Sequence, residues 1–165
     1  MEDTCGILTK LKEKFGTAVI STNTSGDIPS VIVSSESLFS TIEFLKDDHD
    51  AGYDFLTDIC GIHYPENELP LGIIYHLHNL RENRRIRIKT FVSLINPSVA
   101  TVSPLFSSAN WMERETYDFY GIIFIGHPNL KRILNVEYLD FFPMRKEYPL
   151  EDPTREDKDD RFFGR

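Results

Sequence analysis

The chain has 165 residues, of which 41% are hydrophobic, so it is long enough to bury a core as one domain or as one domain with a tail. Its net charge of -8 argues against general nucleic-acid binding, which depends on basic patches. No apolar run approaches the roughly 20 residues that span a bilayer, and the acidic start, 1–5, is unlike a secretory signal, so we expect a cytoplasmic protein.

The start of the sequence predicts a helix followed by a hairpin. Apolar residues recur at helical spacing from Ile7 to Phe15, and Gly16 then ends the helix. The β-rich runs 17–22 and 28–33 flank a turn of small polar residues, and together they predict a β-hairpin. Pro29 has no backbone N–H to donate, so it predicts an edge position for the second strand.

The middle of the sequence predicts a second helix and three further strands. Ser34 or Ser35 is a suitable N-cap for a helix that carries the apolar residues between Leu38 and Leu45. Residues 53–62 then indicate a strand, or the edge of a helix followed by a strand. Alternating or β-branched runs at 71–79 and 85–94 indicate two further strands, joined as a hairpin.

Positive charge is concentrated between residues 71 and 112, where 5 basic residues face 1 acidic one, whereas residues 1–70 hold 13 acidic residues against 4 basic ones. In the last of the three strands, apolar residues alternate with Arg85, Arg87 and Lys89, so one face meets the core and the other carries three cations. These cations either bind an acidic partner or balance the acidic N-terminal half, and the sequence favours neither interpretation.

The C-terminal half predicts helices, a short strand and a tail. A short helix is expected to begin at Ser103, and a longer one, 111–120, to end at Gly121. Residues 122–125 predict a short strand.

The predicted fold class is therefore α+β, with a mixed, largely antiparallel sheet, flanking helices and an extended C-terminal tail. We expect an α+β domain over 1–134 and the tail over 135–165. The end of the tail is charge-rich and contains Phe162 and Phe163, which would be exposed to solvent unless they anchored the tail. The tail is therefore expected to dock on partner subunits.

The helix around residues 113–118 interleaves charges with aromatics. Glu113 and Glu115 are two residues apart and so point to opposite sides of a helix, which argues against an acid/base pair. The spacing of Asn110 and Glu113 predicts a capping box, and Arg114 is expected to pair with Asp118 at i,i+4.

The histidines allow a second class of interpretation. His76 and His78 share a strand face and, with His63 or Cys60, offer ligands to a metal, although such scattered ligands favour packed or solvated histidines. His127 precedes a proline in a turn and is expected to bond a backbone carbonyl or a carboxylate of a neighbouring chain rather than to transfer a proton.

An intrinsic cofactor is not expected. Cys5 and Cys60 are the only cysteines and form no CxxC, so the chain lacks a disulfide framework and a thiolate set for zinc or an iron–sulfur cluster. The alternative from a different class is a stand-alone metal or acid/base enzyme that uses the histidines with Glu113 or Glu115.

Residues 110–150 closely resemble the C subunit of bacterial respiratory complex I, the proton-translocating NADH:quinone oxidoreductase. The family motif has a Glu-Arg-Glu triplet, an acid, two bulky residues, a histidine, a basic residue and two aliphatic residues at fixed spacing. This sequence matches every fixed position, with Glu113-Arg114-Glu115, Asp118, Phe119-Tyr120, His127, Lys131 and Ile133-Leu134. Asn96-Pro97-Ser98 and the run 143–150 also look like the family's.

The resemblance implies a non-catalytic structural or assembly subunit in the peripheral arm of the complex. It implies a hetero-oligomer in which the D subunit is the main contact and the B and I subunits lie near, with membrane contact only through the assembled complex. It also implies that FMN, the iron–sulfur clusters and quinone are bound by other subunits. The expected location is peripheral, at the cytoplasmic side of the bacterial inner membrane.

The alternative within the superfamily is the equivalent subunit of a related ferredoxin- or deazaflavin-driven dehydrogenase or of a membrane-bound hydrogenase. We expect no catalytic, cofactor-binding or metal-binding residue in this chain. The family signature and the probable subunit interface are carried by Trp111, Glu113, Arg114, Glu115, Tyr117, Asp118, Gly121, His127, Pro128, Arg132, Arg145, Lys146, Tyr148 and Pro149.

Overall fold

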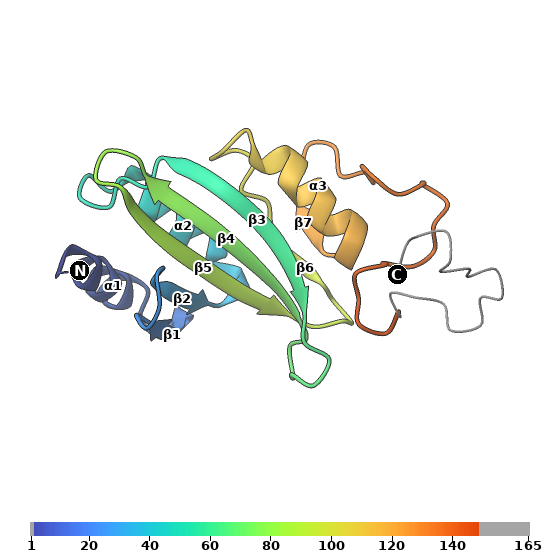
Figure 1. Cartoon of the computed structure of the whole chain (residues 1–165), viewed down its shortest axis with the longest axis horizontal. Helices are drawn as coiled ribbons and strands as arrows, with labels where there is room; N and C mark the ends of the chain where they lie inside the picture. The colour runs from blue at the N-terminus through green and yellow to red at the C-terminus, as the bar shows by residue number, and fades with distance from the viewer. Residues whose placement is uncertain (1, 149–165) are drawn as a thin grey trace, which may run out of the picture.

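The computed structural model describes residues 2–148, and its fold is α+β, as predicted (Figure 1). No helix within these residues is long and apolar enough to cross a bilayer. The elements in chain order are α1 (Glu2–Phe15), β1 (Val19–Asn23), β2 (Ser30–Val33), α2 (Leu38–Asp47), β3 (Phe55–His63), β4 (Leu71–Asn79), β5 (Arg84–Val92), β6 (Ser98–Ala100), α3 (Ala109–Tyr120) and β7 (Ile123–Ile125).

The main sheet has five strands in the order β1-β2-β5-β4-β3. The β2–β5 pair is parallel and the other pairs are antiparallel, so the sheet is mixed and largely antiparallel, as the sequence predicts. The short strands β6 and β7 form a separate parallel pair.

The edge position predicted for the second strand is wrong, because β2 lies between β1 and β5. Pro29 precedes the first residue of β2, so its missing N–H removes no bond within the strand. Its carbonyl accepts a hydrogen bond from the backbone N–H of Arg87, at 2.9 Å, and so begins the parallel pairing with β5.

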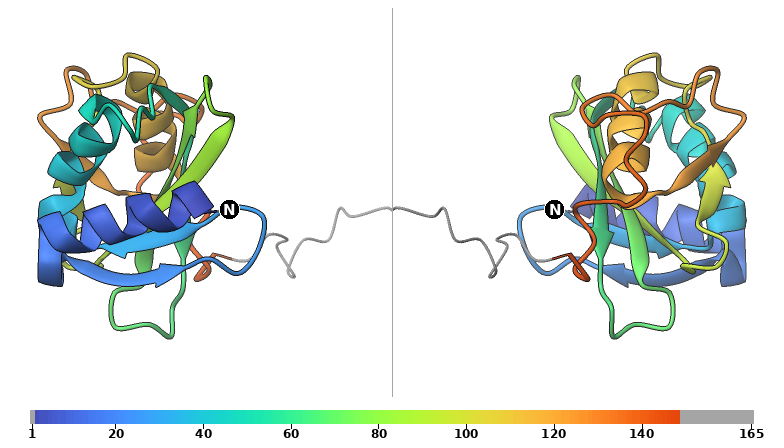
Figure 2. Two further views of the ribbon diagram at one scale, coloured as in Figure 1. Left: turned by 90° about the vertical axis from the view of Figure 1, so that its left-hand side faces the viewer. Right: turned by 90° about the vertical axis from the view of Figure 1, so that its right-hand side faces the viewer.

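The core lies between the main sheet and the helices. Strands β4 and β5 alternate buried and half-buried side chains along their length, as expected for a sheet with one covered face. Figure 2 shows α2 and α3 on the same side of β3, β4 and β5, with no helix of the described residues on the other side. Within residues 2–148, therefore, no helix covers the outer face of these three strands.

Two predictions about helix starts fail. The helix α2 begins at Leu38, after a 3-10 turn over Ser35–Ser37, and no side chain caps it; Ser34 instead accepts the N–H of Ser37 through its backbone carbonyl. The helix expected from Ser103 is absent from the described structure, because the amides of residues 105 and 106 both bond the carbonyl of Val102 and close a turn.

The described part of the predicted tail, residues 135–148, folds back against α3 (Figure 1). The N–H of Met144 donates to the carbonyl of Phe119 at 3.2 Å, and Nε of Arg145 donates to the carbonyl of Tyr120 at 2.8 Å. The boundary at 134 stays a prediction. Phe162 and Phe163, the proposed anchors, lie outside the described residues.

The contact between β3 and α3 depends on a glycine. A Cβ atom at Gly61 would lie 2.3 Å from Cδ2 of Tyr120, which is closer than any packed side chain allows. Only a residue without a side chain lets the ring of Tyr120 lie on the strand.

We expect Gly61→Ala to lower the free energy of unfolding by about 1–3 kcal/mol, since the ring of Tyr120 must move away from the strand. Urea unfolding of the purified chain measures this change. Gly6→Ala is the matched control, because nothing lies within 4 Å of that position, which is in a helix. An unchanged unfolding free energy for Gly61→Ala would contradict the packing.

Candidate functional site

The signature residues gather on α3 and on the segment 127–148 that follows it. The helix ends where the sequence predicts, at Gly121, whose φ of +74° suits a residue without a Cβ atom and whose N–H donates to the carbonyl of Tyr117 at 2.8 Å. A Cβ at this position would also lie 2.5 Å from Cε2 of Phe142. Gly121 therefore ends the helix and makes room for the returning chain.

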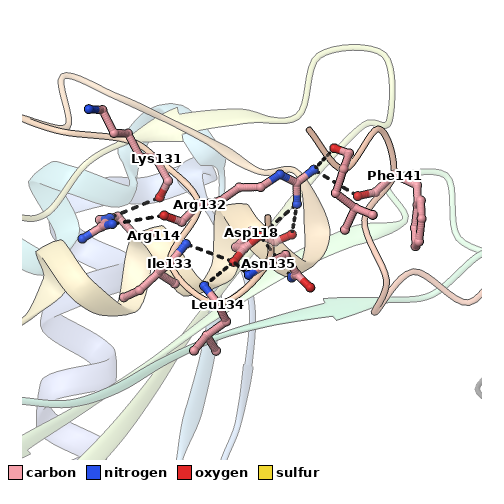
Figure 3. A network of polar contacts seen from close by, with 9 residues as sticks. Arg114, Asp118, Lys131, Arg132, Ile133, Leu134, Asn135 and Phe141 are labelled. Carbon is pink, nitrogen blue, oxygen red and sulfur yellow. Dashed lines mark hydrogen bonds and ion pairs between the residues drawn. The ribbon is translucent and has the colours of Figure 1, made fainter. Parts of the chain in front are cut away.

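Asp118 is the centre of the polar network in Figure 3, and its side chain is fully buried. Oδ2 accepts the backbone N–H groups of Ile133 (3.0 Å), Leu134 (2.8 Å) and Asn135 (2.9 Å). Oδ1 accepts Nη1 of Arg132 at 2.8 Å and Nδ2 of Asn135 at 3.1 Å. Burial alone would raise the pKa of Asp118, but these donors together lower it well below its usual range.

Arg132 extends the network to a third segment. Its Nη1 also donates to the carbonyl of Asp118 at 2.9 Å, and its Nη2 donates to the carbonyls of Leu139 at 2.7 Å and Phe141 at 3.0 Å. The guanidinium lies 5.0 Å from the ring centroid of Phe142. One buried ion pair therefore joins α3, the segment after β7 and the residues around 140 (Figure 3).

The predicted Arg114–Asp118 pair is wrong. Arg114 instead donates Nε to the carbonyl of Lys131 and Nη2 to the carbonyl of Arg132, both at 3.1 Å. Its guanidinium also lies 5.1 Å from the ring centroid of Trp111. The helical spacing allowed the pair, but the two oxygens of Asp118 already accept five hydrogen bonds from residues 132–135.

The capping role predicted for Glu113 is also wrong. Its side chain is fully buried and bonds the segment before the helix rather than the N–H of Asn110: Oε1 accepts the N–H of Val102 at 2.7 Å, and Oε2 bonds the hydroxyl of Thr101. Burial raises the pKa of Glu113 to about 7, although both hydrogen bonds lower it. The helix itself starts after Ser108, with no side-chain cap.

Thr101 links Glu113 to Ser103. Its Oγ1 accepts the backbone N–H of Ser103 at 3.1 Å, lies 2.9 Å from Oγ of Ser103 and also contacts Oε2 of Glu113. Together with the bond from the N–H of Val102, these contacts hold Glu113 to the segment before α3.

His127 has the structural role that the sequence predicts. Its Nε2 lies 3.0 Å from the carbonyl of Asn110, and its Nδ1 accepts the N–H of Asn129 at 3.0 Å. These partners fit a neutral ring that carries its proton on Nε2. Oε2 of Glu113 lies 3.9 Å from the same nitrogen, too far for a hydrogen bond.

In the C-terminal run, Arg145 packs on the ring of Phe142 and Lys146 bonds β3 through its backbone. Arg145 lies 4.7 Å from the ring centroid of Phe142, and Tyr117 meets the same ring edge-on at 6.3 Å. The backbone N–H of Lys146 donates to Nδ1 of His63 at 3.0 Å. Sequence reasoning did not identify Phe142 as a contact for these side chains, and the basic residues close to it in the sequence were the only indication of such a contact.

Other residues of α3 and of the segment that follows β7 face solvent, and some of them belong to the signature. Trp111 is 61% exposed, and Glu115, one turn along α3, is exposed as well. On the segment held by Asp118, Leu134 is 67% exposed and Tyr138 is 87% exposed. We call these four residues the α3 patch. Of the other signature residues, Pro128 and Tyr148 are also exposed, and Pro149 lies outside the described residues.

The structure does not assemble the ligand sets that the sequence suggested for a metal. His63 is buried and bonds Lys146, whereas His76 and His78 lie together on the outer face of β4, as predicted. Cys60 approaches His76, but the third group close to both is Asp58, which sequence reasoning did not include.

Asp58, His76 and Arg87 form a line across three strands, because the register pairs His76 with each of the other two. Nε of Arg87 donates to Nε2 of His76 at 2.8 Å, and Nδ1 of His76 lies 3.6 Å from Oδ2 of Asp58. Burial, and next the charge of Arg87, lower the pKa of His76. Arg87 therefore occupies Nε2 of the ring, while Nδ1 faces Asp58.

Comparison with known proteins gives one consistent family. A family model described as "Respiratory-chain NADH dehydrogenase, 30 Kd subunit" matches residues 31–154. The C subunit of NADH-quinone oxidoreductase from Methylobacterium sp. (strain 4-46) is 40% identical over 141 residues, which cover 86% of this chain and 65% of that protein. The corresponding C subunit from Citrifermentans bemidjiense is 38% identical over 148 residues, which cover 89% of this chain and 90% of that protein.

The chain spans less than two thirds of the length of the first of these relatives. Among solved structures, a trypsin-resistant fragment of Nqo5 has a TM-score of 0.65 and 28% identity, covering 75% of this chain and 99% of the fragment. A chain of the membrane-bound sulfane sulfur reductase, described as an archaeal respiratory membrane complex, has a TM-score of 0.72 and 19% identity. The match covers 88% of this chain and 85% of that chain. At that identity, the second likeness shows the fold alone.

We expect the stability contribution of Glu113 to depend on pH. Its pKa is about 7 in the folded chain against 4.5 as the ordinary value, so the contribution is present below pH 4.5 and is lost as the pH rises through 7. Glu113→Gln keeps a donor toward Thr101 and does not titrate. Relative to wild type, this variant should gain about 3 kcal/mol of unfolding free energy between these two pH values, as urea unfolding would show. Parallel pH profiles would contradict a buried acid.

Removing Asp118 should be far more damaging than removing an exposed carboxylate of the same helix. Asp118→Ala leaves Arg132 and three backbone amides without their acceptor, and we expect a loss of about 3–5 kcal/mol in unfolding free energy. Glu115→Gln should change it by less than about 0.5 kcal/mol. Thermal and urea unfolding compare the two variants, and equal stabilities would show that the network does not hold the fold.

Proposed function

Because this chain belongs to the family of the 30 kDa subunit of the respiratory-chain NADH dehydrogenase, we propose that it is a structural subunit of a proton-translocating NADH:quinone oxidoreductase. In this proposal the complex is the enzyme, and the chain itself performs no chemical step. Its role is to hold neighbouring subunits of the peripheral arm together.

The observation that carries the structural role is the state of the polar signature residues. Asp118 and Arg132 pair with each other, and the side chains of Arg114, Glu113 and His127 bond backbone groups within the chain. A catalytic acid, base or nucleophile must reach a substrate, and these groups instead fix one backbone segment to another. Their arrangement suits a scaffold.

The cofactors are proposed to lie in other subunits. An iron–sulfur cluster takes four thiolates, and these 165 residues hold two cysteines. The relatives are named as subunits of an NADH–quinone oxidoreductase, so FMN, iron–sulfur clusters and quinone are assigned to the rest of the assembly.

The α3 patch is proposed to dock on a partner subunit. Exposed tryptophan and tyrosine side chains beside a carboxylate are typical of interface anchors, since they bury large areas at a low entropic cost. We assign the main contact to the D subunit, with the B and I subunits close by, and we place the assembly peripherally at the cytoplasmic side of a bacterial inner membrane. The C-terminal run beyond residue 148 would continue this contact.

Substitutions in the α3 patch should separate assembly from folding. We expect Trp111→Ala to weaken binding to the partner by about 2 kcal/mol or more, as for an interface anchor, while the unfolding free energy of the purified chain stays close to wild type. The measurement is the amount of complex recovered through a tag on this chain from a gentle detergent extract of its own membranes.

Leu80→Ala is the control, because Leu80 is 56% exposed in the β4–β5 turn, away from α3. It should leave recovery unchanged. Normal recovery of the Trp111→Ala complex with a lower turnover per complex would contradict the structural role. The flavin-bearing subunits recovered with wild type would show whether NADH or another donor drives the complex.

A further inference from the structure

The outer face of β3, β4 and β5 carries a row of cations that the proposed function does not use. Arg85, Arg87 and Lys89 alternate with buried residues on β5, and His76 and His78 stand beside them on β4. The view of Figure 1 looks onto this side of the three strands, where no helix of the described residues lies. We call these five residues the cationic face.

The three cations have no acidic partner within the described residues. Salt bridges there join Lys10 to Asp48 and Asp50, at 3.6 and 2.5 Å, and Arg132 to Asp118, but none includes Arg85, Arg87 or Lys89. Arg87 donates to the imidazole of His76 rather than to a carboxylate. Burial, and next the charge of Arg87, lower the pKa of His76 and so disfavour the charged imidazolium. The acidic N-terminal half therefore does not balance these charges by direct pairing.

Three like charges on alternate residues of one strand repel one another unless counter-charges lie close by. In the row of paired residues that crosses β3, β4 and β5 at Arg87, Asp58 is the only carboxylate. The chain as a whole has a net charge of -8, so this face has the opposite sign to the rest of the molecule. Such a local reversal of sign is typical of a surface that meets an acidic partner.

An apolar groove continues the cationic face. It has a volume of about 390 Å³ and is lined by Ile20, Ile32, Leu69 and Phe91 among others. The register places Ile32 beside Lys89 in the paired strands β2 and β5, so the groove begins where the row of cations ends. A segment that crosses both would need acidic residues followed by an apolar side chain.

We propose that the cationic face and this groove bind an acidic, partly apolar segment of a neighbouring subunit, as a second docking surface separate from the α3 patch. The inference rests on the proposed membership of a multisubunit complex. The observations favour a protein segment over an anionic bilayer, because the apolar groove beside the cations has room for side chains, which a layer of lipid headgroups does not offer.

Lys89 provides a direct test through its amine. The complex is purified in detergent through a tag on this chain, and lysines are acetylated with an N-hydroxysuccinimide ester in the complex and in the free chain. A carboxylate close to Lys89 raises its pKa by about one unit, so acetylation should slow about tenfold or more in the complex. Lys12, exposed on α1, is the matched control and should change less than about twofold.

A carbodiimide then identifies the partner, because it joins Lys89 only to a carboxyl group in direct contact. We expect a cross-linked peptide between Lys89 and an Asp or Glu of another subunit, and we expect it to be absent from the Lys89→Gln complex.

If the complex is recovered with Lys89 as reactive as in the free chain, the inference is wrong while the proposed function stands. If protection is present in membranes and lost in detergent, the occupant is lipid and the inference is also wrong. If no complex is recovered, the proposed function fails first.

Discussion

The fold of the C-terminal half depends on one buried carboxylate. Asp118 accepts five hydrogen bonds from residues 132–135, and this fixes a segment without helix or strand against α3. Because Arg132 is held at the same place, its remaining donors reach the carbonyls of Leu139 and Phe141 and bring the chain back over the helix. A buried ion pair is stabilising only when its other donors and acceptors are satisfied, and here the backbone satisfies them.

Burial and hydrogen bonding shift the pKa values of two carboxylates of the same helix in opposite directions. Asp118 receives backbone amides and a guanidinium, so its charged form is favoured although it is buried. Glu113 receives one amide and one hydroxyl, and these do not offset burial, so its neutral form persists to about pH 7. Both are structural groups, and the exposed residues Trp111 and Glu115 are left for contact with another protein.

Local features of this fold could be predicted from the sequence, and long-range ones could not. The alternation around Arg87 and the helix end at Gly121 depend on neighbouring residues, and both predictions are confirmed. The hydrogen-bond partners of Glu113 and Asp118 lie 11–17 residues away from them along the chain. The spacing rules for helices apply only to neighbouring turns, so they predicted a cap and an ion pair that the structure does not have. The position of β2 in the sheet depends on its pairing with β5, which a proline just before the strand does not predict.

The family motif therefore indicated which residues matter before their geometry was known, but it assigned all of them to an interface, whereas Glu113, Asp118 and Arg132 are buried within the chain. In our interpretation, the inward residues fold the chain and the outward residues join it to a respiratory complex. The most direct measurement is quantitative mass spectrometry of what copurifies with the tagged wild-type chain from gently solubilised membranes. We predict that the B, D and I subunits copurify in equal amounts with this chain, and recovery of the chain alone would contradict that interpretation.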